Sequence, residues 1–305
     1  MSLLELRNVL KRYDGHTAVD HVSFTVPDGA IFGLLGPNGA GKTSIIRMIT
    51  TITRPDEGEI YVAGQRVGRE TTGRVGYMPE ERGLYKKMDV EDHLMYLAQL
   101  KGLSAKQARG ELDRWFDRFD IQTWRKKKIE ELSKGMQQKI QFIATVVHDP
   151  TLIILDEPFS GLDPINTNLI KDEIYELAQR GKQILFSTHR MEQVEEICDY
   201  IVLINKGKNV LEGDVADIRD RFRENVFEVY VDGELGADVL TRYVPKERLR
   251  DGGYVLSLPD GADGNVLLGE LVGAGVRVRS FREVLPSLDE VFIKQVGSYD
   301  PLMTG

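Results

Sequence analysis

Eight residues that begin at a glycine carry the clearest chemical pattern in this chain. The segment GPNGAGKT, residues 36–43, fits the spacing G-x-x-x-x-G-K-[ST] and lies between an apolar run and a helical pattern. Such glycines let successive backbone N–H groups turn toward one phosphate, and the helix that follows presents its positive end to the same anion. Lys42 can reach the β- and γ-phosphates, and the Thr43 hydroxyl can ligate Mg²⁺. The pattern therefore predicts that the chain binds a nucleoside triphosphate. The expected binding loop comprises Gly36, Pro37, Asn38, Gly39, Ala40, Gly41, Lys42, Thr43 and Ser44.

Two carboxylates and a histidine end two later apolar strands. Asp156 and Glu157 follow the run Thr151–Leu155, and His189 follows the run Gln183–Thr188. An aspartate at a strand end can hold Mg²⁺ beside a phosphate loop, and the next residue can accept a proton from an attacking water. His189 considered alone is more typical of a core histidine than of a catalytic one. We therefore predict Asp156 as a metal ligand and Glu157 as a general base.

Strands and helices alternate over the first two thirds of the chain. This order predicts an α/β fold with a mainly parallel, doubly wound sheet around the phosphate loop. Beyond about Arg219, short alternating strands and Gly/Asp-rich turns predict a small α+β domain. We therefore expect two domains, residues 1–219 and 220–305, with a helical subdomain at about 84–150.

Local patterns predict several element boundaries. The segment His21–Val26 alternates as a short strand. Asp89 can cap a helix, and Ser104 with Gln107 forms a capping-box pattern that opens the next helix.

Composition limits the class of protein. The 305 residues are 41% hydrophobic and 29% charged, which is typical of a globular protein with a sizeable core. A net charge of −8 argues against binding nucleic acid by bulk electrostatics. The single cysteine, Cys198, cannot form an internal disulfide and suits a reducing cytoplasm. No apolar run approaches the length of a membrane span, so we expect any membrane role to require a partner.

Read together, several short motifs resemble the ATPase subunit of an ATP-binding-cassette (ABC) transporter. The phosphate loop is followed in the family's order by LSKGM at 132–136, LIILDE at 152–157, SGLD at 160–163 and His189. MPEERGLY at 78–85 and the terminal PSLDEVFIKQVG resemble the branch that drives export, including sodium-extrusion and drug-resistance systems. The resemblance implies a P-loop ATPase of ABC type with ATP and Mg²⁺ as ligands.

The same resemblance implies roles for residues that would be ambiguous alone. Tyr13 would stack on adenine, although periodicity alone favours an ordinary strand-end tyrosine. Ser133 and Gly135 would reach the γ-phosphate held by a second copy, with Asp163 joining the two sites. His189 would contact the γ-phosphate, and Glu80 would be a metal ligand with Thr43 and Asp156.

Two departures from the family pattern bear on the site. The usual LSGGQ is LSKGM here, so Lys134 replaces a glycine and Met136 replaces the glutamine. Glu80 stands where a glutamine is expected; its carboxylate can still ligate Mg²⁺ or water, but it adds negative charge. Ser133 and Gly135 are retained, so we expect the anion site to be retained as well.

The leading hypothesis is an ATP-hydrolysing motor subunit of an exporter. Its expected partners are a second ATPase subunit, with a homodimer favoured, and integral-membrane permease subunits that hold it at the cytoplasmic face of the membrane; no nucleic-acid partner is expected. One alternative is a soluble ABC ATPase that acts on ribosomes or nucleic acid. Another is a regulatory module that senses ATP without turnover, which intact Lys42, Asp156, Glu157 and His189 argue against.

Overall fold

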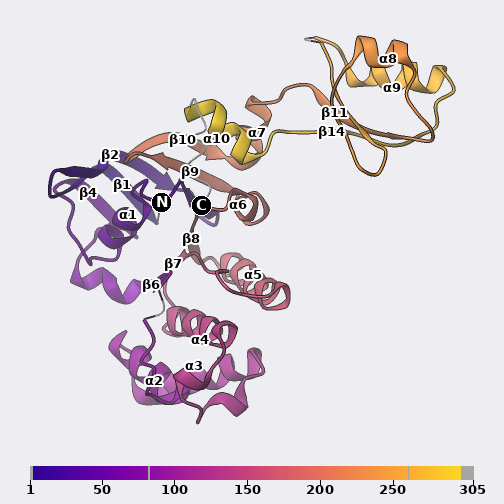
Figure 1. Cartoon of the computed structure of the whole chain (residues 1–305). Helices are drawn as coiled ribbons and strands as arrows, with labels where there is room; N and C mark the ends of the chain where they lie inside the picture. Colours follow the sequence, from indigo (N-terminus) through magenta and orange to yellow (C-terminus); the bar gives the residue numbers. More distant parts are fainter. Residues whose placement is uncertain (1–2, 82, 260, 297–305) are drawn as a thin grey trace. The chain divides into compact units, whose positions relative to one another are not determined.

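The computed structural model describes residues 3–81, 83–259 and 261–296. The chain divides into two compact units, residues 1–215 and 216–305 (Figure 1). Each unit has a hydrophobic core of its own. The expected boundary at about Arg219 falls inside helix α7 (Val215–Arg221), four residues after this division.

A six-stranded sheet forms the centre of the first unit. Its strands, in spatial order, are β10 (Lys208–Asp214), β9 (Tyr200–Asn205), β3 (Ile31–Leu35), β8 (Gln183–Thr188), β7 (Leu152–Asp156) and β6 (Val75–Met78). All neighbours pair in parallel except β10 and β9, which form an antiparallel hairpin at one edge. Every residue of β3, β7 and β8 is buried, as expected for strands covered on both faces. The predicted parallel α/β sheet is confirmed.

A second, antiparallel sheet and a helix pack on one face of the central sheet. The sheet has the order β2 (His16–Val26), β1 (Leu4–Tyr13), β4 (Glu57–Val62) and β5 (Gln65–Arg66). Helix α1 (Lys42–Ile49) shares its core, and Figure 1 shows α5 (Pro164–Gln179) and α6 (Met191–Ile197) on the other face. Helices on both faces explain why the central strands are continuously apolar.

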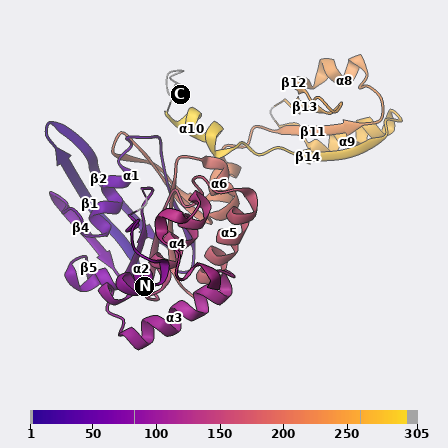
Figure 2. The same ribbon diagram turned by 60° about the horizontal axis from the view of Figure 1, so that its bottom comes forward.

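Three longer helices and three 3₁₀ turns complete the first unit. They are η1 (Arg69–Arg74), α2 (Val90–Leu100), α3 (Ala105–Arg118), η2 (Gln122–Trp124), η3 (Ile129–Glu131) and α4 (Lys134–Val146). Figure 2 shows α2, α3 and α4 gathered in one group. The predicted capping box at Ser104 is present: its hydroxyl accepts a hydrogen bond from the Gln107 N–H at 3.3 Å, and the Gln107 side chain accepts from the Ser104 N–H at 3.0 Å. Arg118, at the end of α3, pairs with Glu173 of α5 at 2.6 Å and so ties this group to the core.

The parallel arrangement gathers the chemically important segments at one edge. The glycine loop follows β3, Glu80 follows β6 by two residues, Glu157 follows β7 and His189 follows β8. Because the carboxyl ends of parallel strands lie at the same edge of a sheet, these four segments converge. The register pairs Asp156 of β7 with Ser187 of β8, which brings the two strand ends level.

The second unit is a four-stranded antiparallel sheet with two helices between its strands. Its elements are α7, β11 (Val226–Val231), α8 (Ala237–Arg242), β12 (Val244–Arg248), β13 (Tyr254–Ser257), α9 (Gly264–Gly273), β14 (Val278–Glu283) and α10 (Leu288–Val296). The spatial order β12-β13-β11-β14 with the chain order βαββαβ is the ferredoxin-like arrangement. Phe227, Val229, Leu256, Leu267 and Leu271 lie in its core.

Candidate nucleotide-binding and catalytic site

A pocket of about 340 Å³ lies at the converging strand ends. It is bounded by the glycine loop, the strand ends of the central sheet and the turn between β1 and β2. Its lining comprises Tyr13, His16, Ala18, Asn38, Gly39, Ala40, Gly41, Lys42, Thr43, Ser44, Glu80, Asp156, Glu157 and His189. The pocket therefore brings together residues from the phosphate loop, the acidic strand end and the histidine strand end.

Two glycines of the loop are required by its backbone. Gly36 has φ 146°, and a Cβ there would lie 2.1 Å from the carbonyl oxygen of Ile204. Gly41 has φ 113°, and a Cβ there would lie 2.4 Å from the carbonyl oxygen of Ala18. Any other residue would be strained at these angles and would collide with backbone. Helix α1 begins directly after Gly41 without a side-chain cap, so its first N–H groups are free to bind an anion.

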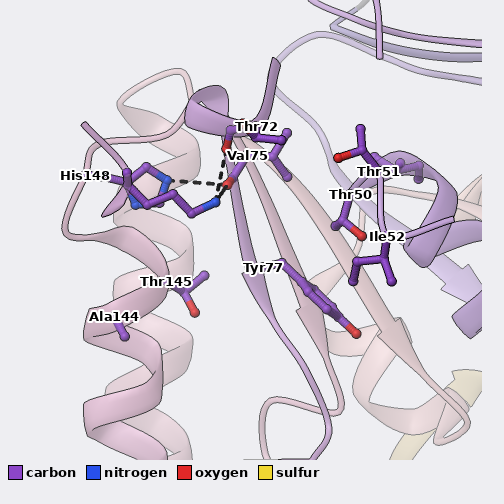
Figure 3. Close-up of a pocket in the computed structure, with 11 residues that line it drawn as sticks. Thr50, Thr51, Ile52, Thr72, Val75, Tyr77, Ala144, Thr145 and His148 are labelled. Carbon is purple, nitrogen blue, oxygen red and sulfur yellow. Dashed lines mark hydrogen bonds between the residues drawn. The ribbon is translucent and has the colours of Figure 1, made fainter. Parts of the chain in front are cut away.

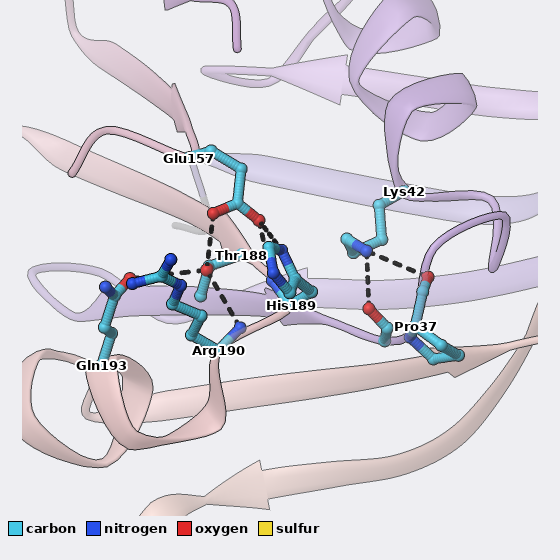
Figure 4. A network of polar contacts seen from close by, with 8 residues as sticks. Pro37, Lys42, Glu157, Thr188, His189, Arg190 and Gln193 are labelled. Atoms are coloured by element: carbon cyan, nitrogen blue, oxygen red, sulfur yellow. Dashed lines mark hydrogen bonds and ion pairs between the residues drawn. The ribbon is translucent and has the colours of Figure 1, made fainter. Parts of the chain in front are cut away.

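Lys42 is a buried cation whose hydrogen bonds, among the described residues, go to neutral acceptors of its own loop. Its Nζ donates hydrogen bonds to the carbonyl oxygens of Gly36 at 2.6 Å and Pro37 at 3.1 Å (Figure 4). Burial lowers the pKa of Lys42, and the carboxylates of Glu157 and Asp156 partly oppose that shift. A phosphate oxygen is a stronger, charged acceptor, so this ammonium can exchange a loop carbonyl for a phosphate.

The acidic end of β7 is buried and electrostatically crowded. Burial, together with the neighbouring carboxylates of Glu157 and Glu80, raises the pKa of Asp156 to about 6, while Lys42 acts in the opposite direction. A divalent cation beside Asp156 would favour its ionised form. Thr43, Asp156 and Glu80 all present oxygen atoms, which are the ligands that Mg²⁺ prefers.

These oxygen donors fit a magnesium ion that is shared with a nucleotide. In the part of the chain that the structure describes, no three His, Cys, Asp or Glu side chains form a self-contained metal site. Mg²⁺ commonly uses one or two carboxylates and completes its shell with phosphate oxygens and water. The donor set therefore suits Mg²⁺ bound with a nucleotide rather than alone.

Glu157 is held by the end of the neighbouring strand. Its Oε1 accepts a hydrogen bond from the His189 backbone N–H at 2.8 Å and lies 2.6 Å from His189 Nδ1. Its Oε2 accepts a hydrogen bond from Thr188 Oγ1 at 3.0 Å, as Figure 4 shows. The backbone of Glu157 has φ 49°, an uncommon conformation for a residue with a side chain. Such local strain is typical of functional sites.

Five predicted site residues do not line the pocket. Gly36 and Pro37 lie at the start of the phosphate loop and accept the hydrogen bonds of Lys42, whereas Ser133, Gly135 and Asp163 lie at the starts of α4 and α5. Ser133 is the N-cap of α4 and accepts a hydrogen bond from the Met136 N–H at 3.3 Å. Asp163 caps α5 in the same way, with the Asn166 N–H at 2.9 Å, and Asn166 lowers its pKa. A Cβ at Gly135 would lie 3.7 Å from the Leu162 side chain, so the LSKGM and SGLD motifs adjoin each other. Their suggested role toward a second copy remains a prediction.

Three residues near the site were not predicted from the sequence. His16 and Ala18 line the pocket, and Thr188 holds Glu157. His16 and Ala18 belong to a strand that was expected to begin only at His21. Thr188 directly precedes His189 at a strand end, and this adjacency was the one feature of the sequence that could have indicated its role at the site.

A second pocket, of about 270 Å³, lies between the end of α1, strand β6 and helix α4 (Figure 3). Lys101 donates hydrogen bonds there to the carbonyl oxygens of Thr72 at 3.0 Å and Val75 at 2.9 Å. His148 Nε2 lies 3.4 Å from the same Val75 oxygen. These contacts fasten the helical group to β6, the strand that leads to Glu80.

The comparisons with known proteins agree with this geometry. A family model described as "ABC transporter" matches residues 19–160. YhaQ of Bacillus subtilis (strain 168), an uncharacterized ABC transporter ATP-binding protein, is 42% identical over 296 residues, covering 97% of this chain and 99% of the relative. The chain belongs to the ABC transporter ATP-binding proteins.

Further matches extend over both units of this ABC protein. Residues 213–296 match the C-terminal domain model of DrrA1-3-like ATP-binding proteins. Nod factor export ATP-binding protein I of Burkholderia pseudomallei (strain 1710b) is 35% identical over 81% of this chain and 79% of the relative. A solved ATP-binding subunit of an ABC transporter has a TM-score of 0.68 and 32% identity, covering 72% of this chain and 93% of that one.

Family membership decides between the transport subunit and the soluble ATPase raised by the sequence. The predicted ABC resemblance and P-loop fold are confirmed, and the family binds ATP. The matches support a transport-coupled subunit rather than a soluble ATPase that acts on ribosomes or nucleic acid. Among the residues described, none of the helices combines the length and apolar character needed to cross a bilayer.

Proposed function

We propose that this chain hydrolyses ATP in a Mg²⁺-dependent reaction and thereby powers export through a separate membrane permease. The observation that carries the proposal is the pocket in which Lys42, Asp156 and Glu157 meet beside the glycine loop. The direction of transport is supported by the relative named for Nod factor export and by the DrrA-like C-terminal match.

In the proposed binding mode, the loop 36–44 surrounds the phosphates with backbone N–H groups. Lys42 leaves its loop carbonyls and donates to the β- and γ-phosphates. Tyr13 is 37% exposed at the pocket rim, where its ring can stack on adenine. Thr43, Asp156 and Glu80 would hold Mg²⁺, which would neutralise charge on the phosphates.

In the proposed reaction, Glu157 orients a water molecule and accepts its proton. The water oxygen attacks the γ-phosphorus, and the bond from the γ-phosphorus to the β–γ bridging oxygen breaks. His189 contacts the γ-phosphate through a side chain that is 46% exposed and so can turn toward it. A general base contributes about 10²- to 10⁴-fold to turnover.

The proposed active form is a head-to-tail dimer, with a homodimer favoured. Ser133 and Gly135 lie outside the pocket of their own chain and at the start of a helix, where an anion is favoured. A second copy could therefore receive its γ-phosphate contact from these residues, with Asp163 joining the two sites.

We assign residues 1–219 as the ABC ATPase domain, with its helical subdomain at about 84–150, and residues 220–305 as an accessory domain. The helical subdomain is the part proposed to face the permease. On this proposal the chain works at the cytoplasmic face of the membrane, held there by its permease partner.

The Glu157→Gln variant tests the catalytic part of the proposal. The amide keeps the side-chain volume but cannot accept the proton, so turnover of Mg·ATP should fall about 10²- to 10⁴-fold while ATP binding survives. Loss of a negative charge beside the γ-phosphate should also favour a closed dimer. Size-exclusion chromatography should then show an ATP-dependent shift from monomer to dimer. Near-normal turnover of this variant would overturn the assignment of Glu157 as base.

The Ser133→Glu substitution, added to Glu157→Gln, tests the dimer. Its carboxylate should repel the partner's γ-phosphate and abolish the ATP-dependent shift. Ser104→Glu is the matched control, because Ser104 also caps an exposed helix start but lies in no ABC motif. A dimer that is indifferent to ATP, or that is lost equally in both serine variants, would contradict the head-to-tail arrangement.

A further inference from the structure

Three consecutive residues at the end of β8 hold Glu157. Its backbone N–H donates to the Ser187 carbonyl oxygen at 2.9 Å, and its Oε1 accepts from the His189 N–H at 2.8 Å. The Thr188 hydroxyl donates to Oε2 at 3.0 Å. Glu157 is therefore fixed at its backbone and at both carboxylate oxygens, and Thr188 provides the single side-chain donor on Oε2 in the described part of the chain.

The surroundings of Thr188 fix the direction of its proton. Its Oγ1 accepts a hydrogen bond from the Arg190 backbone N–H at 3.1 Å, which occupies a lone pair. The competing acceptor, Gln193 Oε1, is 3.5 Å away and neutral, whereas Glu157 Oε2 is closer and charged. Hydrogen bonds to ionised acceptors are shorter and stronger than neutral ones, so the hydroxyl proton lies toward Glu157.

Thr188 and His189 differ in their freedom to move. Thr188 is fully buried and does not line the nucleotide pocket, whereas the His189 side chain is 46% exposed. If His189 turns toward a phosphate, Oε1 loses the contact with its ring. The Thr188 hydroxyl is then the side-chain contact that keeps the carboxylate in place.

We propose that Thr188 is a positioning residue for the catalytic base: it holds Oε2 of Glu157 so that Oε1 faces the attacking water. This inference rests on the proposed function, in which Glu157 is the base. In the step that Thr188 supports, a water proton moves to Oε1 as the water oxygen bonds to the γ-phosphorus and ADP leaves. Thr188 itself exchanges no proton and contacts no substrate.

Paired substitutions of Thr188 separate the hydroxyl from the bulk of the side chain. Thr188→Val keeps the branched shape and removes the donor, so kcat should fall about 10- to 100-fold, as expected for a lost hydrogen bond to a charged group. KM for Mg·ATP should stay within about twofold, because Thr188 does not line the nucleotide pocket and its loss should affect the chemical step rather than binding. Thr188→Ser keeps the hydroxyl and should restore kcat to within about threefold of the wild type. Equal kcat values for the Val and Ser variants, or a rise in KM that accounts for the loss, would overturn the proposal.

A double-mutant cycle distinguishes positioning of the base from a general structural effect. In the Glu157→Gln background, adding Thr188→Val should leave the single-turnover rate unchanged, because the group that Thr188 positions has already lost its function. A structural role would instead lower the rate by the same factor in both backgrounds. Thr71→Val is the matched control, since Thr71 is equally buried but hydrogen-bonds to Gly68, outside the site; it should leave kcat unchanged.

Two further comparisons keep the test decisive. Binding of a fluorescent ATP analogue to the full chain establishes that each variant is folded. If Thr188→Val fails to fold, Thr188→Ala and Thr188→Ser are compared in the same way, with the alanine variant expected to be the slower. Normal turnover of Glu157→Gln alone would mean that the base is wrongly assigned, whereas a slow Glu157→Gln with a normal Thr188→Val would refute only the role of Thr188.

Discussion

We expect buried His93, on helix α2, to make the stability of the folded chain sensitive to acid. The side chain is completely buried on α2, and neither ring nitrogen has a hydrogen-bond partner among the described residues. Its ring instead packs with that of Tyr85 in a T-shaped pair, with centroids 5.6 Å apart. Burial lowers the pKa of His93 to about 4, so the folded chain holds it neutral.

The effect of pH on the free energy of unfolding follows from the different pKa of His93 in the folded and unfolded chain. An unfolded chain protonates this histidine below about pH 6.5, whereas the folded chain resists protonation until about pH 4. The unfolded state therefore binds more protons in this window, and stability falls as the pH is lowered through it. Between pH 7 and pH 5, His93 alone should reduce the free energy of unfolding by about 2 kcal/mol.

The His93→Leu variant isolates this contribution. At pH 7 its free energy of unfolding should stay within about 1 kcal/mol of the wild type, because the imidazole makes no hydrogen bond that the substitution would remove. At pH 5 the variant should be the more stable by about 2 kcal/mol. Urea unfolding can be followed by intrinsic fluorescence, since the two tryptophans of the chain, Trp115 and Trp124, both lie in the helical subdomain.

An exposed histidine provides the control. The His21 side chain is 45% exposed, and its backbone has φ 51°, which asparagine tolerates well. His21→Asn should therefore keep the acid sensitivity of the wild type. The reasoning is refuted if His93→Leu and the wild type lose the same stability between pH 7 and pH 5.

Two further predictions concern the nucleotide pocket. Gly41→Ala should weaken ATP-analogue binding and lower stability by more than the ~1–2 kcal/mol cost of a left-handed residue, because its Cβ would lie 2.4 Å from the Ala18 carbonyl oxygen. Gly39→Ala, with φ 78° and open space around its Cβ, should lose only the stability that the left-handed backbone costs. If urea titrations show that both alanine variants lose the same free energy of unfolding, this account is contradicted. Glu80→Gln should keep ATP binding and most Mg²⁺-dependent turnover, because Glu80 is exposed and an amide oxygen can still coordinate. Complete loss of ATPase activity would show that the Glu80 carboxylate is required for chemistry.

The parts of the fold that depend on local pattern could be predicted from the sequence. The phosphate loop, the apolar strand Thr151–Leu155 and the helix cap at Ser104 each need only neighbouring residues, and all three are present in the structure. Strand β8 (Gln183–Thr188) was predicted with its observed bounds for the same reason.

The parts that depend on tertiary contacts could not be predicted in this way. Strand β2 begins at His16 rather than His21, because its polar start is held by pairing with Tyr13 of β1. Strand β12 (Val244–Arg248) has only exposed residues and a proline, so it shows no alternation, yet it pairs with β13. Asp89 precedes α2 as expected but makes no capping hydrogen bond through its side chain.

The charges of the pocket explain why a nucleotide should enter with its cation. Lys42 supplies one positive charge, whereas Asp156, Glu157 and Glu80 are three carboxylates, so ionised groups alone would leave a net charge of −2. The raised pKa of Asp156 is a consequence of this arrangement, because burial and the acidic neighbours favour the neutral form of its carboxyl group. A free nucleoside triphosphate would add like charge to an already negative site, but Mg²⁺ held beside Asp156 would offset two of those charges and favour that carboxylate as a ligand. On the proposed function, the acidic groups that hydrolysis needs would therefore favour the magnesium complex over the free nucleotide.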